Sequence, residues 1–218
     1  MCRDFACPDR DCALCPRLKA FIDNNRRFYP DFFNAPVPSF GDLNGELLIV
    51  GLAPGLRGAN RTGRPFTGDF AGDLLYKSLI DYGFAAGTYQ ARPDDGLKLI
   101  NTRLTNAVRC VPPENKPTGG EVKTCSAFLI REINAMPNLK VVLALGSLAH
   151  NAVLSVFGAK KSACKFAHNA LHSVSFGERE IKLLDTYHTS RYNVNTGKLT
   201  PEMFDAVFKT LAALMPRG

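Results

Sequence analysis

Short apolar runs alternate with stretches of helical periodicity along most of this chain. Four runs rich in Val, Leu and Ile are each followed by a polar or glycine-rich turn, a pattern typical of strands buried on both faces. They cover residues 46–51, 105–109, 140–145 and 181–185. The pattern therefore predicts four strands separated by longer connections.

Helical periodicity fills most of the intervals between these runs. The predicted helices cover residues 17–27, 72–82, 121–135, 147–157 and 201–214. Thr118 stands three residues before Glu121, which is the spacing of a capping box, and Thr200 precedes Pro201 at the start of the last helix. Strands that alternate with helices predict an α/β fold with a mostly parallel sheet between two helical layers. A chain of 218 residues is long enough for one such domain, here 1–218 with a cysteine-rich N-terminal arm.

In parallel sheets of this kind, ligands bind outside the carboxyl ends of the strands. Four segments follow the predicted strands: residues 51–55 and onward, 110–117, 146–147 and 186–190. The first, second and last of these are also the richest in chemically active side chains. We therefore expect the functional site where these segments meet.

The segment after the first predicted strand, residues 51–69, is rich in glycine and arginine. Its glycines let the backbone approach a ligand closely, and Arg57, Arg61 and Arg64 give it positive charge. It matches neither a P-loop nor the GxGxxG fingerprint, so no nucleotide cofactor is indicated. Phe66 is an aromatic ring that can stack on a base. Asp69 precedes a predicted helix, where an N-cap and a catalytic carboxylate are equally good interpretations.

Charge adds one further indication. The formal net charge is +7, and a basic chain favours a polyanionic partner because counterions are released when phosphates are neutralised. The charge alone remains a weak signal. No run of 18 apolar residues occurs, and the N-terminus lacks the apolar core of a secretory signal. We therefore expect a cytoplasmic protein without a membrane segment.

Seven cysteines make a metal site the favoured interpretation for a reducing compartment. Cys12 and Cys15 form a Cys-x2-Cys pair, and Cys110 and Cys125 flank a proline-rich loop further along. Four thiolates suit a [4Fe–4S] cluster or a zinc ion, and the long second spacing leans towards the cluster. Buried free thiols are the alternative. Cys2 or Cys7 can replace one ligand or stay unligated, and Cys164 stands alone.

Taken together, these motifs resemble the uracil-DNA glycosylase superfamily, and most closely its family 5, the type B enzymes. The resemblance covers nearly the whole chain. It rests on the Cys-x-x-Cys-Pro-Arg-Leu opening, on residues 51–55 with 60–69, on 107–118 and on the His-Thr-Ser of 188–190. It implies a three-layer fold with a four-stranded parallel sheet and a [4Fe–4S] cluster. The implied activity is removal of uracil from DNA, and of other deaminated bases such as hypoxanthine and xanthine.

The resemblance also assigns roles to individual residues. Asp69 corresponds to a carboxylate that activates water, Asn115 to a polar helper, His188 to the motif-two histidine and Phe66 to a stacking ring. The remaining substrate-binding positions that it implies are Gly51, Leu52, Ala53, Gly55 and Ser190. The cluster ligands that it implies are Cys12, Cys15, Cys110 and Cys125.

Three positions depart from related patterns. Family 4 enzymes have an acidic residue where this chain has Leu52, which strengthens the case for Asp69 as the group that activates water. Gly55 stands where the family often has alanine. Thr189 stands where the second motif usually has proline, so a rigid φ is lost beside His188.

The expected partner is DNA with deaminated bases, double-stranded and also single-stranded, bound by a monomer. Base flipping would bring the lesion to the site, and Arg191 or Tyr192 is expected either to enter the gap in the duplex or to form an ordinary surface turn. His150 is interpreted as a satisfied core histidine. Two alternatives remain open: a flavodoxin-like iron–sulfur electron carrier and a damaged-DNA binding module without catalysis.

Overall fold

The computed structural model describes residues 7–216. Its main sheet has six strands, and a separate pair of short strands forms a second sheet. The main-sheet strands are β1 (Phe40–Gly41), β2 (Leu47–Gly51), β5 (Thr102–Asn106), β6 (Val141–Leu145), β7 (Leu171–Phe176) and β8 (Arg179–Thr186). The short pair is β3 (Ala85–Ala86) and β4 (Lys98–Leu99).

The helices lie between these strands along the chain. The longer ones are α1 (Pro16–Phe28), α3 (Phe70–Asp81), α4 (Gly119–Asn134), α5 (Ser147–Phe157) and α7 (Pro201–Leu214). The short ones are α2 (Ala59–Thr62), α6 (Arg191–Asn195) and the 3₁₀ turn η1 (Pro113–Asn115). All five predicted helices are therefore present, and the predicted caps at Thr118 and Thr200 both accept backbone hydrogen bonds.

The sheet is parallel at its centre and antiparallel at both edges. Its strand order is β1-β5-β2-β6-β8-β7, and the four inner strands pair in parallel. β1 pairs with β5 and β7 with β8 in antiparallel fashion. The α/β prediction is confirmed, but the expected count of four strands is wrong because both edge strands were missed. β1 has only two residues and β7 carries mostly exposed or half-buried side chains, so neither gives a strong apolar signal.

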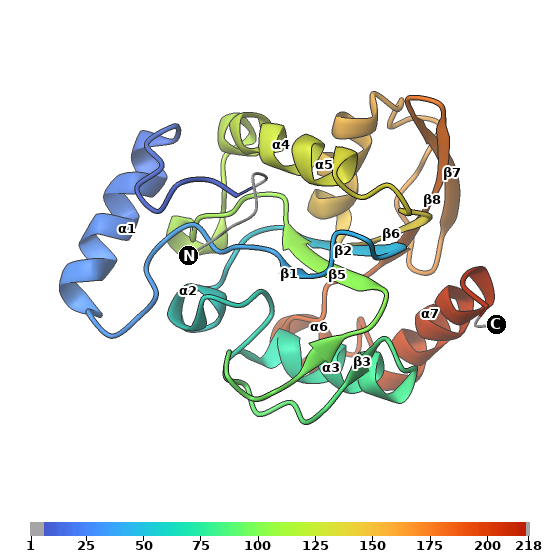
Figure 1. The fold of residues 1–218 in the computed structure, drawn as a ribbon, viewed down its shortest axis with the longest axis horizontal. Helices are drawn as coiled ribbons and strands as arrows, with labels where there is room; N and C mark the ends of the chain where they lie inside the picture. Colours follow the sequence, from blue (N-terminus) through green and yellow to red (C-terminus); the bar gives the residue numbers. More distant parts are fainter. Residues whose placement is uncertain (1–6, 217–218) are drawn as a thin grey trace.

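Alternating side chains of each inner strand fill two separate cores. Leu47 and Ile49 pack with α3 and α7, whereas Leu48 and Val50 pack with α4 and α5. Figure 1 shows α4 and α5 on one face of the sheet and α3 with α7 on the other. The expected three-layer arrangement is thus present. A third apolar cluster joins α1 to the segment after β5.

One strand lies three residues earlier than predicted. β5 covers Thr102–Asn106 rather than 105–109, because its side chains are mostly polar and are buried through specific partners. Arg103, for example, is 3% exposed and forms an ion pair with Glu132. Beyond the strand, Ala107 and Val108 donate backbone hydrogen bonds to Gly51 and Leu52. These bonds hold the two segments side by side where the strands end.

None of the helices in the described chain is both long enough and apolar enough to cross a membrane.

Candidate active site

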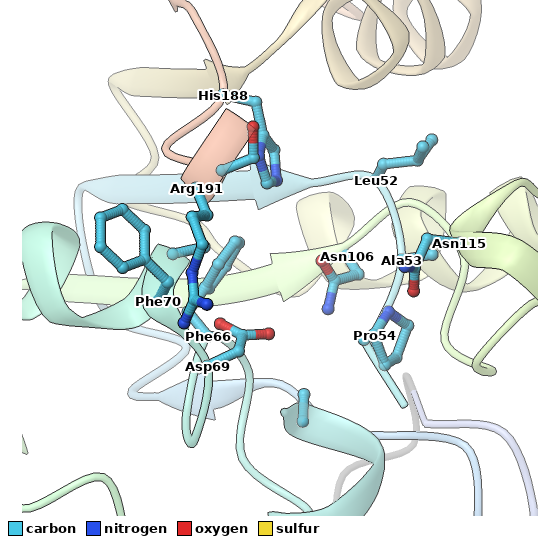
Figure 2. Close-up of a pocket in the computed structure, with 14 residues that line it drawn as sticks. Leu52, Ala53, Pro54, Phe66, Asp69, Phe70, Asn106, Asn115, His188 and Arg191 are labelled. Atoms are coloured by element: carbon cyan, nitrogen blue, oxygen red, sulfur yellow. The ribbon is translucent and has the colours of Figure 1, made fainter. Parts of the chain in front are cut away.

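A cavity of about 500 Å³ opens at the carboxyl ends of β2, β5 and β8. Side chains from four separate chain segments line it (Figure 2). These residues are Leu52, Ala53, Pro54, Gly55, Ala59, Phe66, Asp69, Phe70, Ala71, Asn106, Asn115, His188, Ser190 and Arg191. The cavity therefore lies where the parallel topology places a ligand site.

Eight of the nine residues predicted for catalysis or substrate binding line this cavity, and Gly51 is the exception. Gly51 is the last residue of β2, and a Cβ atom there would come within 2.5 Å of the Phe66 ring and 2.6 Å of Asn106 Oδ1. Its missing side chain therefore lets both residues approach the strand end. The structure brings the predicted residues together, while their individual roles stay predictions.

Phe66 forms one wall of the cavity in a strained conformation. Its φ is 52°, in the left-handed region that bulky residues rarely adopt, and its side chain is 6% exposed. Such strain persists only where the surroundings impose it and is concentrated at functional sites. Phe66 packs with the core of α3 and α7 and also belongs to the lining of the cavity.

Asp69 is held at the start of α3 without the usual capping bond. It occupies the N-cap position, but its side chain caps no backbone N–H, and its buried Oδ1 has no hydrogen-bond partner. Burial raises the pKa of Asp69, while the nearby N–H groups of Gly72 and Ala71 act in the opposite direction. The N–H groups at the start of α3 therefore account for part of this side chain, but they leave Oδ1 without a partner. A carboxylate with one unpaired oxygen beside a cavity suits chemistry with water.

Gly58 gives a direct test of this placement. A Cβ atom at position 58 would lie 2.1 Å from Asp69 Oδ2, so Gly58→Ala must displace the carboxylate. Because misplacing a reacting group by about 1 Å can cost about 10²-fold, we expect base-excision activity to fall about 10- to 100-fold. Activity is measured by single-turnover excision, and folding by the melting temperature.

The matched control is Gly119→Ala. Gly119 begins α4, and a Cβ atom there would meet nothing within 4 Å. This variant should keep wild-type activity. Equal activity of Gly58→Ala and wild type would contradict the importance of the Asp69 position.

His188 enters the cavity from the loop that follows β8. Burial lowers the pKa of His188, so its imidazole is neutral at neutral pH and one ring nitrogen is available as a hydrogen-bond donor. The backbone of the loop is fixed locally, because Asn193 Nδ2 donates to the His188 carbonyl at 2.8 Å. Figure 2 shows the His188 ring, the Asp69 carboxylate and the Asn106 amide directed at the same space.

Asn106 is the residue that the sequence reasoning missed. It is the last residue of β5 and 4% exposed, and its amide faces the cavity. With the strand predicted at 105–109, position 106 fell inside a strand rather than at its carboxyl end. The correct strand boundary would have marked it as a ligand contact.

Asn115 lies at the exposed rim of the cavity. It follows Glu114 in η1, and both residues have positive φ, 57° and 55° respectively. Asparagine tolerates this conformation better than most residues. The turn therefore presents the Asn115 side chain across the cavity from Asp69 (Figure 2).

Arg64 has a different role from the one its charge suggested. Its guanidinium forms a bidentate ion pair with Asp95, at 2.8 and 2.7 Å, and its side chain is 4% exposed. The pair lowers the pKa of Asp95, and the rings of Phe40 and Tyr76 lie 5.2 Å from the guanidinium. Arg64 thus anchors the loop internally, while Arg57 and Arg61 stay exposed.

The four cysteines expected to bind metal line one small cavity that shares no residue with the candidate active site. Cys12 and Cys15 approach from the N-terminal arm, Cys110 from the segment after β5 and Cys125 from α4. Burial and the neighbouring sulfurs raise the pKa of Cys110, and burial raises that of Cys125. Cys7 is not among the lining residues, and Cys2 lies outside the described part of the chain.

The sulfur atoms are not closely grouped. Among residues 7–216, the one set of three or more His, Cys, Asp or Glu ligand atoms lying within 4.8 Å of one another is His150, His172 and Asp185. A single zinc ion with Zn–S bonds of about 2.3 Å would hold its sulfurs roughly 3.8 Å apart. No three of the four sulfurs, all of them in the described part of the chain, lie within 4.8 Å of one another, a wider grouping than a mononuclear zinc site requires.

The group of two histidines and Asp185 is a hydrogen-bonded cluster. His150 Nδ1 lies 2.8 Å from Asp185 Oδ1, and His172 Nε2 lies 3.2 Å from Oδ2. The second nitrogen of His150 donates to the Cys164 carbonyl at 3.0 Å. The interpretation of His150 as a satisfied core histidine is therefore confirmed.

The fold and the cavity agree with a comparison to known families. The model of the uracil DNA glycosylase superfamily matches residues 38–212, a range that includes every residue lining the cavity. That superfamily is the class of protein to which the geometry points.

Individual relatives narrow the assignment. A type-5 uracil-DNA glycosylase of Thermus thermophilus is 44% identical over 211 residues, which cover 93% of this chain and 94% of that protein. A type-5 enzyme of Pyrobaculum aerophilum is 40% identical over 93% of this chain and 88% of its own length. A type-4 enzyme of Sulfurisphaera tokodaii is 31% identical over 78% of this chain and 72% of its own. The chain belongs to the type-5 family of the uracil-DNA glycosylase superfamily.

Proposed function

We propose that this protein removes uracil from DNA by hydrolysis of the N-glycosidic bond, and that the cavity at the carboxyl ends of β2, β5 and β8 is its active site. The observation that carries the proposal is the convergence of Asp69, Asn106 and His188 on one cavity in a chain of this family. A flavodoxin-like electron carrier would explain neither the convergence of these three side chains nor the membership of this family.

The target base reaches the cavity by flipping out of the DNA stack. Phe66 then stacks on the flipped base. The Asn106 amide carries both a donor and an acceptor, which match the O4 acceptor and the N3–H donor of uracil. Phosphate contacts come from exposed cations such as Arg57 and Arg61.

Bond cleavage leaves positive charge on the sugar and negative charge on the departing base. Ionised Asp69 orients the water that attacks C1′ and offsets the charge on the sugar. Neutral His188 donates a hydrogen bond to the base oxygen on which negative charge builds up, because its lowered pKa keeps the imidazole uncharged. Asn115 assists from the rim. The hydroxyl of the water stays on C1′ and its proton ends on the base anion, so the products are free uracil and an abasic site. No lysine nucleophile and no strand nicking are involved.

Other deaminated bases are included in the proposal. A cavity of about 500 Å³ lies within the range that holds drug-sized ligands, so its volume also admits the purines hypoxanthine and xanthine. The substrate is double-stranded DNA, and single-stranded DNA as a second form, and the enzyme acts as a cytoplasmic monomer.

A [4Fe–4S] cluster held by Cys12, Cys15, Cys110 and Cys125 completes the proposal. The convergence of four cysteines from three parts of the chain fits such a group, and their wide spacing fits a polynuclear cluster better than one zinc ion. Two of these cysteines, Cys110 and Cys125, are buried, and their thiolates need a cationic partner, since burial alone favours the protonated thiols. Bound there, the cluster cross-links the arm to the segment after β5 and to α4.

The test compares excision from labelled oligonucleotides that contain uracil, hypoxanthine, xanthine or thymine. Wild type should release uracil and leave thymine, with abasic product detected after alkali. Asn106→Ala should lower kcat/KM for uracil about 10- to 100-fold, because a lost base contact of this kind is worth about 1–3 kcal/mol. Asn138→Ala is the control, because Asn138 is exposed and lies before β6, at the amino ends of the strands and away from the cavity. A lack of uracil release by the holoenzyme would reject the proposed function.

A further inference from the structure

Thr189 is the residue that joins the two sides of the proposed site. It is fully buried, with 0% exposure, and does not line the cavity. Its hydroxyl donates a hydrogen bond of 3.0 Å to the carbonyl oxygen of Ala71. Ala71 lies two residues after Asp69 in the first turn of α3.

Among the described residues, the other hydrogen bonds of the loop that carries His188 do not reach α3. Tyr187 N–H donates to His168 Nδ1 at 3.3 Å, and Asn193 binds both the His188 carbonyl and the Ser190 hydroxyl. These bonds fix the shape of the loop, but not its position relative to α3. The Thr189 hydroxyl supplies the link from this loop to the helix on which Asp69 sits.

A second contact, exposed to solvent, also joins the His188 loop to α3. The Arg191 guanidinium lies 5.5 Å from the centre of the Phe70 ring, so residues 189 and 191 both reach the first turn of α3. The Arg191 contact is exposed to solvent and exchanges easily with water, whereas the Thr189 bond is enclosed. The buried bond is therefore the one able to fix a distance.

We infer that Thr189 is a positioning residue, whose hydroxyl sets the separation of His188 and Asp69 by tying the His188 loop to the carbonyl of Ala71. The inference rests on the proposed roles of His188 and Asp69. Where the related motif has proline, the ring fixes φ within the loop. Here a hydrogen bond between two elements replaces that internal restraint. The bond from the Thr189 hydroxyl to the Ala71 carbonyl keeps the ring N–H of His188 aligned with the base oxygen on which negative charge develops.

Thr189→Val tests the inference, since valine has nearly the same shape and lacks the hydroxyl. We expect the single-turnover rate of uracil excision to fall about tenfold, while KM stays within about twofold, because substrate binding does not use this bond. Thr189→Ser retains the donor and should restore the rate to within about threefold of wild type. A role in folding alone would lower the melting temperature without this division between kcat and KM.

The same substitution in a His188→Ala background identifies the residue through which Thr189 acts. If Thr189 positions His188, the double variant should excise uracil at the rate of His188→Ala alone. A further tenfold loss, or a Thr189→Val rate within twofold of wild type, would overturn the inference. A wild-type rate for His188→Ala alone would instead contradict the proposed role of His188, so the two failures are distinguishable.

Discussion

Asp69→Asn should abolish most of the excision activity and leave the fold intact. Asparagine has the same shape as aspartate but cannot hold the negative charge that orients water and offsets the charge on the sugar. A positioned general base contributes about 10²–10⁴-fold, and we expect a loss of that size in the single-turnover rate. Binding of DNA that contains an abasic site should be retained, which separates loss of chemistry from loss of affinity.

The control for this variant is Asp73→Asn. Asp73 is an exposed acid in the first turn of the same helix and does not line the cavity. The Asp73→Asn variant should excise uracil at the wild-type rate. If Asp69→Asn excises uracil within about threefold of the wild-type rate, Asp69 is not the group that orients water and its role is structural.

The same carboxylate predicts how activity and stability depend on pH. Burial raises the pKa of Asp69 above its ordinary value of 3.8, so the group becomes protonated, and activity falls, at a higher pH than for an exposed aspartate. Since the pKa is higher in the folded than in the unfolded state, its stabilising contribution exists at low pH and is lost as pH rises through the folded value. Asp69→Asn should therefore melt at the same temperature as wild type, or higher, at neutral pH.

Hydrophobic periodicity was sufficient to predict the inner sheet and the long helices, because these elements are stabilised mainly by apolar burial. β6 and α5 lie almost where the pattern placed them. Hydrophobic periodicity failed to place β5 correctly because the side chains of this strand are buried through polar partners, as in the ion pair of Arg103 with Glu132. That single shift of three residues also concealed Asn106 at the strand end.

The site was predictable as a set of segments, but not as a set of contacts. The rule for parallel sheets places the segments that carry Leu52, Asp69 and His188 together at the carboxyl ends of the strands. The sequence does not specify that Arg64 turns inward to Asp95, or that the Thr189 hydroxyl bonds to Ala71. Both contacts join residues that only the three-dimensional packing brings together.

Cys110→Ala combined with Cys125→Ala should remove the proposed cluster and cost the protein much of its stability. The two cysteines are buried and lie on different elements, so a cluster that binds them links the N-terminal arm to the segment after β5 and to α4. The chain between Cys15 and Cys110 closes a loop of 95 residues, by subtraction of their numbers. A cross-link that closes a loop of about 100 residues stabilises by about 4–5 kcal/mol. For a chain of this size, that corresponds to a fall in melting temperature of roughly 10–15 °C.

Activity should respond much less than stability, because no residue is shared between the cysteine cavity and the proposed active site. We expect the fraction of the double variant that remains folded to excise uracil at close to the wild-type rate. Wild type should contain iron and absorb visible light, and the double variant should have lost both. Cys164→Ala, which replaces a buried cysteine outside this cavity, is the control and should keep the iron. A colourless wild-type protein that contains zinc would show that the assignment of a cluster is wrong. A double variant that folds but is inactive would show that the cluster is needed for catalysis.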